Sequence, residues 1–386
     1  MTTTGSAAEQ FFVDTTEWSF LHALLRDRTG KQRSRVGAYL VAILLTYAPL
    51  VIAVLGGDRD APSFSFFADP NVLCMFFVTL PTILLLTATD DRALQDALKR
   101  IQRDGILVLP DVKTGQLQLR WRARFRLLNV TGAGLAVVTG AAAADGVYHV
   151  FARHYAAFTW WAAPNGRFLP SGYMFLFSVL LFFALVAIYL VRVGSLSLLL
   201  RDIVEHAELH MLPGHPDRCG GLRPIGRLGL RNQYALTVSG FNVAVLALEF
   251  HYLFHVDFDQ PGDARSLVVL FAIVAMAYVL FAPVVFLGPL LAFRDGMKRA
   301  KDQLMSEVAQ RLRLELQRFR EQVPDGTITK EDEDRVDRLR KVGRIIEELP
   351  VWPFDASTLR RFITAYAIPI AGGLLANLAA TLLKHF

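Results

Sequence analysis

The chain has 386 residues, of which 53% are hydrophobic and 20% charged, and it carries a formal net charge of +6. An ordinary soluble domain with this many charges is less hydrophobic, so the apolar residues must be concentrated in separate segments. The basic excess does not indicate nucleic-acid binding, because basic residues alternate with acidic ones and no aromatic stacking platform accompanies them.

Residues 1–35 form a polar N-terminal segment in which no cleavable signal is expected. Residues 1–16 are small, polar and acidic, and no basic stretch precedes an apolar core there. Residues 18–25 are amphipathic and are expected either to lie along the inner membrane surface or to pack on neighbouring cytoplasmic parts.

Seven runs without a charged residue follow. They are Val36–Gly57, Pro70–Thr89, Leu127–Ala144, Phe168–Val191, Asn232–Leu248, Ser266–Phe293 and Phe362–Leu383. A bilayer core of about 30 Å is crossed by about 20 helical residues, and a backbone in lipid must bond internally. We therefore expect an all-α polytopic transmembrane bundle, with six helices in residues 36–293. A seventh segment in residues 351–386 either spans or re-enters the membrane.

The basic residues predict the orientation. All but five of the 41 lysines and arginines lie in residues 1–35, 90–126, 192–231 and 294–361. Because basic loops stay on the cytoplasmic side, this pattern predicts a multi-pass bacterial inner-membrane protein with a cytoplasmic N-terminus. Residues 90–126 and 192–231 are then cytoplasmic loops.

The loop at residues 90–126 is expected to begin as an amphipathic helix that ends near Gly105. Its apolar residues at helical spacing are Leu94, Leu98 and Ile101. Its basic end, RWRARFR, places Trp121 beside the third span, where aromatic and basic side chains anchor helices at the headgroups.

Three residues at the outer ends of predicted spans, Asp145, Glu249 and His251, are candidates for a cation-attracting mouth. The alternative is that they are solvated surface groups. With Arg192 at an inner end, the ionisable residues of the spans all reach an interface. No relay across the membrane midplane is visible, which argues against a proton-coupled transporter.

The loop HAELHMLPGHPDRCGGL contains four candidate metal ligands: His206, His210, His215 and Cys219. On a helix, the first two would share a face, and all four could form a tetrahedral zinc site. However, Glu208 stands midway between the first two histidines, and no zinc signature has this spacing. The alternative is a polar elbow bent by glycine and proline, in which Asp217 bonds nearby amides.

Within this loop, HPDRCGGL contains His215, Pro216, Asp217, Gly220 and Gly221. Together with FLGPLLAFRDGM and WPFDASTLRRF in the same order, it resembles a group of multi-span bacterial membrane proteins with HPD, two variable residues and GGL. The resemblance covers about the second half of the chain. It implies a membrane protein, puts Cys219 at a variable position, and assigns no activity to any residue.

Residues 294–350 are predicted to form a cytoplasmic helical hairpin. One apolar stripe comprises Leu304, Val308, Leu312, Leu316, Phe319 and Val323, and a second comprises Val336, Leu339, Val342, Ile346 and Leu349. Residues 324–326 supply a turn between them, and Thr329 can cap the second helix. The stripes are expected to pack on each other or to mediate subunit contact.

In the last apolar run, Gly373, Asn377 and Thr381 recur every four residues and give one helix face a small, polar character. Such a face can line an aqueous path in a symmetric oligomer, or it can allow helices to pack closely.

The sequence thus predicts a homo-oligomeric channel or channel-like conduit, with lipid and further copies of the chain as partners and no cofactor. One alternative is a non-conducting scaffold or signalling protein whose hairpin docks a soluble cytoplasmic protein. A membrane enzyme or metal-binding protein using residues 206–222 ranks last, because no nucleophile, base and oxyanion set is discernible.

Overall fold

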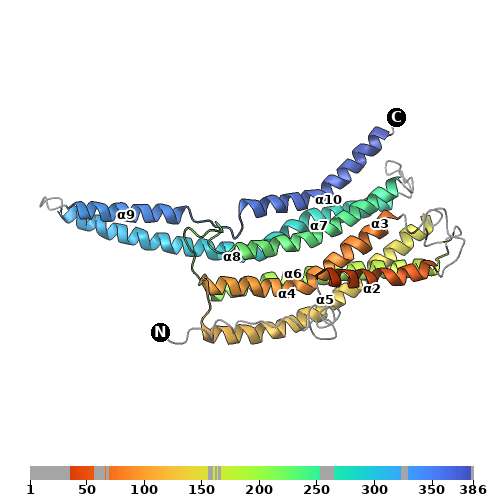
Figure 1. Cartoon of the computed structure of the whole chain (residues 1–386), viewed down its shortest axis with the longest axis horizontal. Coiled ribbons are helices and arrows are strands. Elements are labelled where there is room, and N and C mark those ends of the chain that lie inside the picture. Colours follow the sequence, from red (N-terminus) through yellow and green to blue (C-terminus); the bar gives the residue numbers. More distant parts are fainter. Residues whose placement is uncertain are drawn as a thin grey trace.

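The computed structural model describes residues 35–55, 66, 69–154, 160, 163, 167–252, 265–322 and 329–383. The amphipathic stretch predicted at residues 18–25 lies outside them. In the described part the chain is mostly helical, and long helices run side by side in an elongated bundle (Figure 1).

The helices are α2 (Arg35–Leu55), α3 (Pro70–Leu73), the π-helix η2 (Cys74–Thr79), α4 (Leu80–Arg103), α5 (Asp111–His154), α6 (Pro170–His206), α7 (Arg223–Tyr252), α8 (Arg265–Gln322), α9 (Lys330–Glu347) and α10 (Ala356–Leu383). Two short strands, β1 (Leu107–Val108) and β2 (Glu208–Leu209), pair in antiparallel fashion. Helices α3, η2 and α4 follow one another directly. Pro70 stands at the start of α3 and Pro170 at the start of α6, where a missing N–H costs nothing.

Four helical segments in the described residues are long and apolar enough to cross a membrane: Pro70–Thr87, Val130–His149, Pro170–His206 and Ala272–Glu321. They contain or overlap the second, third, fourth and sixth predicted spans. Residues Tyr39–Leu55 form a shorter apolar helix. The predicted spans at Asn232–Leu248 and Phe362–Leu383 are helical, in α7 and α10, and their crossing of the bilayer stays a prediction.

The outer surface of the bundle is apolar. Only 17% of the apolar segment in α5 and 28% of that in α8 is buried inside the protein. Large side chains on α8, such as Ile273, Met276 and Leu280, are exposed. So extensive an apolar surface is unusual in water and is the expected exterior of a helix in lipid.

Helix α5 packs closely on α6 through glycines. A Cβ at Gly140 would lie 2.6 Å from the backbone oxygen of Leu180, and one at Gly132 would lie 3.1 Å from Cγ1 of Val191. Ala136, between them, is buried. Small residues at this four-residue spacing let two helix backbones approach each other, as is common between membrane helices.

In residues 90–126 the structure contains the predicted amphipathic helix, as the end of α4, but it does not place Trp121 as expected. Leu94, Leu98 and Ile101 are buried in α4, and the helix ends at Arg103, just before Gly105 with φ +70°. Trp121, however, is fully buried, and its indole nitrogen donates to Asp202 at 3.0 Å. The headgroup-anchor interpretation of Trp121 was therefore wrong, because this side chain has a hydrogen-bond partner on α6.

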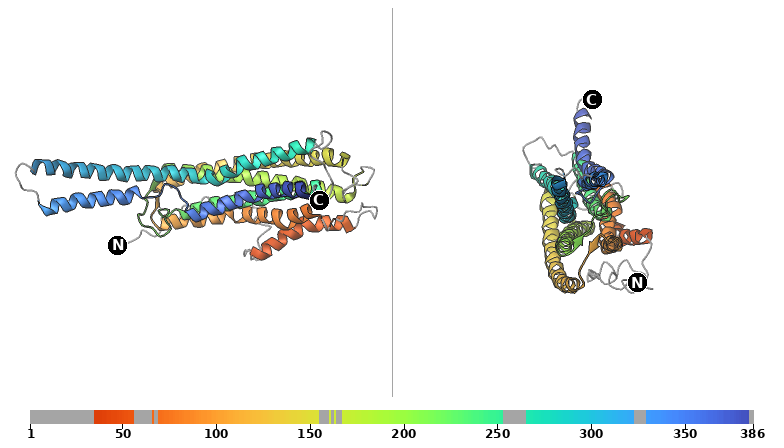
Figure 2. Two further views of the ribbon diagram at one scale, coloured as in Figure 1. Left: turned by 90° about the horizontal axis from the view of Figure 1, so that it is seen from above. Right: turned by 90° about the vertical axis from the view of Figure 1, so that its left-hand side faces the viewer.

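Helix α8 continues beyond the bundle and packs against α9. The two helices lie side by side in the views of Figures 1 and 2. Thr329 and Asp332 form a capping box at the start of α9. At its end, Nζ of Lys301 donates to the carbonyls of Glu347 and Leu349 at 2.5 and 3.0 Å. The pairing of the two helices and the cap at Thr329 are found as expected. The predicted turn at residues 324–326 lies outside the described residues, and the cytoplasmic position of the hairpin stays a prediction.

The two apolar stripes of this pair are buried only in part. Val336, Ile346 and Leu349 are buried, and Val308 packs against the same core as Ile346. Leu316 and Val342 are exposed, so these positions of the stripes do not pack between the two helices, and contact with another subunit stays a prediction for them. A two-helix pair has too little surface to cover every stripe position.

Candidate functional site along helix α7

Helix α7 is an interior helix with buried polar side chains. It packs against α4, α8 and α10. Asn232, Gln233, Thr237, Asn242 and Glu249 on this helix are all buried. Asn232, Asn242 and Glu249 fall within about 100° of one another around the helix axis. They extend over about 26 Å at the helical rise, which is close to the thickness of a bilayer core.

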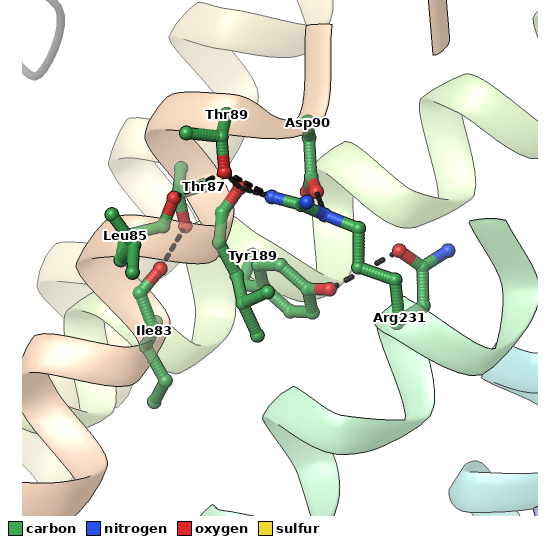
Figure 3. Close-up of polar contacts among 9 residues, drawn as sticks. Ile83, Leu85, Thr87, Thr89, Asp90, Tyr189 and Arg231 are labelled. Carbon is green, nitrogen blue, oxygen red and sulfur yellow. Dashed lines mark hydrogen bonds and ion pairs between the residues drawn. The ribbon is translucent and has the colours of Figure 1, made fainter. Parts of the chain in front are cut away.

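The first group on this line, the arginine cluster, consists of Asp90, Tyr189, Arg231 and Asn232. Nε of Arg231 lies 2.6 Å from Oδ1 of Asp90, whose side chain is fully buried. The same guanidinium donates to the carbonyl of Leu86 at 3.0 Å and to the hydroxyl of Thr89 (Figure 3). A buried carboxylate requires such compensation, so Arg231 joins α7 to the middle of α4.

Helix α6 joins the arginine cluster through Tyr189. Its hydroxyl donates to Oδ1 of Asn232 at 3.2 Å, and both side chains are buried. Arg192, one helical turn further along α6, is also buried. In the part of the chain that the structure describes, Nδ2 of Asn232 has no hydrogen-bond partner. The cluster thus gathers charged and amide groups from three helices where the predicted spans end.

The second group, the carboxyl cluster, consists of Asp69, Asn71, Trp160, Asn242 and Glu249. Asp69 caps α3, with Oδ1 accepting from the Val72 amide at 2.8 Å and Oδ2 accepting from the Trp160 indole at 2.8 Å. The carboxyl of Glu249 lies within hydrogen-bond reach of the Asp69 carboxyl and of the Asn71 amide. Nδ2 of Asn242 donates to Oδ1 of Asn71 at 3.2 Å.

The π-helix η2 borders the line between the two clusters. Its last residue, Thr79, is fully buried, and its hydroxyl lies 3.2 Å from the carbonyl of Val238 on α7. A π-turn inserts one extra residue into a helix and often occurs at functional sites. We call the line formed by the arginine cluster, Thr79 and the carboxyl cluster the polar track.

The opposite face of α7 packs on α8 and α10. The hydroxyl of Thr237 lies 3.1 Å from the Ala365 carbonyl, and Tyr278 of α8 donates to the Tyr366 carbonyl at 3.2 Å. A Cβ at Gly372 would lie 3.9 Å from Cβ of Ala244, which is ordinary van der Waals contact. At Gly372, therefore, α10 contacts α7.

The predicted pore-lining residues Gly373, Asn377 and Thr381 lie in α10, and their side chains are outside the described part of the structure. Of the three candidates for an outer mouth, Asp145 is exposed and lies 3.3 Å from His149. Glu249 is 4% exposed, so it is not a solvated mouth residue. The side chain of His251 is outside the described residues. Sequence reasoning missed Asp69, although an aspartate directly before a proline at a helix start is a capping signal.

The structure does not assemble the four candidate zinc ligands. Helix α6 ends at His206, and the next residues form β2, so His206 and His210 do not share a helix face. His206 Nδ1 lies 2.8 Å from the Asp202 carbonyl, whereas His210 is exposed near Glu208. Among the described residues no three His, Cys, Asp or Glu side chains form a group that could hold a metal ion.

Cys219 is also a poor ligand chemically. Its side chain is fully buried, and this burial, together with the negative charge of Asp217, raises the pKa of the thiol to about 12. A metal binds the thiolate, which is rare at neutral pH for such a group. The metal-binding hypothesis for His206, His210, His215 and Cys219 was therefore wrong.

The HPDRCGGL segment is a turn that starts α7. Oδ1 of Asp217 accepts from the backbone amides of Cys219 and Gly221, each at 2.9 Å, and Oδ2 accepts from the backbone amide of Arg223 at 3.2 Å. Burial raises the pKa of Asp217, but these amides outweigh it and the pKa is lowered. Gly220 and Gly221 have φ of +63° and +91°, which only glycine adopts without strain. The polar-elbow alternative is confirmed.

The start of α7 also contacts the loop between α9 and α10. Nη2 of Arg223 lies 3.1 Å from Oδ2 of Asp355, which caps α10 through the amide of Thr358. A Cβ at Gly226 would lie 2.4 Å from the Pro353 carbonyl, so the backbones are in close contact.

The polar track thus places carboxyl, amide, guanidinium and hydroxyl groups inside the bundle. Such groups bind and exchange water, protons and small ions. No protein family, curated protein or solved structure matches the chain.

Proposed function

We propose that this protein is a multi-span bacterial inner-membrane protein that conducts a small polar or charged solute along the polar track. In this proposal α2 and α7 also span the bilayer, α10 spans or re-enters it, and the N-terminus and hairpin are cytoplasmic. The four long apolar helices support the membrane assignment. The concentration of lysine and arginine in alternate loops supports the orientation.

The observation that carries the proposal is the run of buried polar atoms along α7. Asn232 Nδ2, Asn242 Oδ1 and Glu249 Oε2 are buried and have no hydrogen-bond partner among the described residues. Buried polar groups are almost always hydrogen-bonded, and in a membrane an unsatisfied one is especially costly. A passing solute or its water would satisfy these atoms.

This path runs through a single chain, whereas a path lined by Gly373, Asn377 and Thr381 requires a symmetric oligomer. Homo-oligomeric assembly is a separate proposal, and the mass of the purified protein in detergent tests it. The hairpin is proposed to gate the path, because the loop that joins it to α10 contacts α7 through the ion pair of Asp355 with Arg223.

The test is solute flux into liposomes that contain the purified full-length protein. Asn242→Leu is expected to abolish flux, and Asn377→Leu, the same substitution on α10, is expected to leave it unchanged. The reverse result would favour the oligomeric path lined by α10. Absence of wild-type flux across several ions and potentials would refute conduction.

One observation favours a second function, a scaffold that docks a soluble protein. The hairpin extends beyond the bundle (Figure 2). It exposes Leu314, Leu316 and Ile345. If docking is the function, deleting residues 300–349 abolishes partner capture while the spans remain inserted. Conduction without any such partner would instead support the first function.

A further inference from the structure

We propose that Asp69 and Glu249 hold one proton between them, and that the carboxyl cluster is a proton-binding site at the end of the polar track away from the hairpin. Proton binding follows from the burial of the two carboxyls, their contact with each other and the hydrogen-bond donors around them. The corollary that protons are the conducted species rests on the proposed function.

The first step of the argument is the contact between two buried acids. Asp69 and Glu249 are each 4% exposed, and their carboxyls lie within hydrogen-bond reach of each other. Two ionised carboxylates repel each other strongly when water is excluded. A single proton removes one of the two charges and supplies the hydrogen bond that joins the groups.

The neighbouring groups assign the proton to Glu249. Both oxygens of Asp69 accept from N–H donors, the Val72 amide and the Trp160 indole, and these bonds stabilise an ionised carboxylate. On Glu249, Oε2 has no partner among the described residues. Glu249 therefore carries the acidic hydrogen and donates it to Asp69.

No described basic side chain acts on the two carboxyls to neutralise their charge. The described groups that act on the two carboxyls are each other, the Trp160 indole and the amides of Asn71 and Val72. From α6, Phe175 packs edge-on against Trp160. On α5, Asp145 and His149 contact each other in an exposed position, and Arg167, in the loop before α6, is exposed. The side chain of His251, near the end of α7, is outside the described residues.

A second observation, independent of the acids, indicates a route for the proton. Asn242 is 4% exposed and donates to Asn71, yet its Oδ1 has no hydrogen-bond partner among the described residues. Asn242 lies two helical turns before Glu249 on the same face of α7. This free acceptor can receive a hydrogen bond from water or hydronium that exchanges with the carboxyl cluster. On release, the Glu249 O–H bond breaks, the proton passes to water, and the electron pair stays on Glu249.

The test is a pH titration of the purified full-length protein in detergent, followed by tryptophan fluorescence and by the infrared carbonyl band of a protonated carboxyl. The wild type is expected to lose this band in a single step as the pH rises, together with a fluorescence change that is absent in Trp160→Phe. Glu249→Gln keeps the size and the hydrogen-bonding ability of the side chain and is expected to abolish the step. Asp145→Asn, which alters an exposed carboxyl, is expected to preserve it.

An unchanged step in Glu249→Gln would overturn the proposal, and so would a wild-type carboxyl band that is absent throughout. If Glu249→Gln is poorly folded, Asp69→Asn provides a second variant, because it is expected to shift the midpoint of the step. A midpoint that depends on sodium in place of choline would also contradict a proton as the ligand. Because binding is measured without transport, a titrating cluster in a protein that gives no flux would refute only the proposed function.

Discussion

Replacement of Arg231 by methionine gives the sharpest stability test of the arginine cluster. The change removes the guanidinium that lies 2.6 Å from Oδ1 of Asp90, and it also removes the bonds to Leu86 and Thr89. The Asp90 side chain is fully buried, so water cannot replace the lost cation. Removing one partner of a buried ion pair costs about 3–5 kcal/mol, and we expect a loss of this size.

The assay is reversible unfolding in mixed detergent micelles, with a double-mutant cycle. Asp90→Leu combined with Arg231→Met is expected to be more stable than Arg231→Met alone, because no buried charge remains without its partner. Exposed pairs couple by about 0.2–1 kcal/mol, so a coupling energy in that range would refute the buried clamp. The exposed pair Arg201–Glu205, with side-chain exposures of 68% and 43%, provides the matched control.

Three further predictions concern packing, the elbow and pH. Gly140→Leu is expected to separate α5 from α6, because its Cβ would lie 2.6 Å from the Leu180 carbonyl. Crosslinking between the two helices should therefore fall, whereas the control Gly134→Leu, where a Cβ meets open space, should preserve it. Gly221→Ala is expected to lower the free energy of unfolding by about 2–5 kcal/mol, from left-handed strain and from a Cβ placed 1.8 Å from Ile106; Gly105→Ala, strained but with open space, should cost about 1–2 kcal/mol. Asp217 and Asp355 have lowered pKa values because their hydrogen bonds outweigh desolvation, so they stabilise the fold above the unfolded pKa of about 3.9, and this contribution is lost as the pH falls through the folded pKa. The free energy of unfolding, measured against pH, should fall at low pH, and Asp217→Asn should reduce the slope of this fall. Equal slopes in the wild type and the variant would contradict the role of Asp217.

Local patterns in the sequence predicted the helices and their ends. Apolar spacing predicted the buried residues of α4, and Thr329 was predicted as the cap of α9. Asp217 was expected to bond nearby amides, because aspartate and glycine in a short loop favour turns. Each of these features is set by residues a few positions apart.

Tertiary contacts were not predictable in the same way. Asp69 meets Glu249, and Asp90 meets Arg231, across long stretches of chain whose relative placement no local pattern specifies. His206 and His210 have the spacing of a shared helix face, but α6 ends at His206 and the residues before His210 form β2, which pairs with β1. Trp121 is buried and its indole donates to Asp202 on α6, a contact that no local pattern specifies.

The central claim is that the protein's exterior faces lipid while the polar track inside it is reached by water. Accessibility of introduced cysteines to a small, charged, membrane-impermeant thiol reagent tests this claim most directly, in a background lacking Cys74 and Cys219. In native membranes, Asn242→Cys is expected to react, although Asn242 is 4% exposed in the protein, and Ile273→Cys and Leu280→Cys are expected to stay unreactive, although these residues are 59% and 61% exposed. Labelling at Ile273 and Leu280 with none at Asn242 would contradict the account.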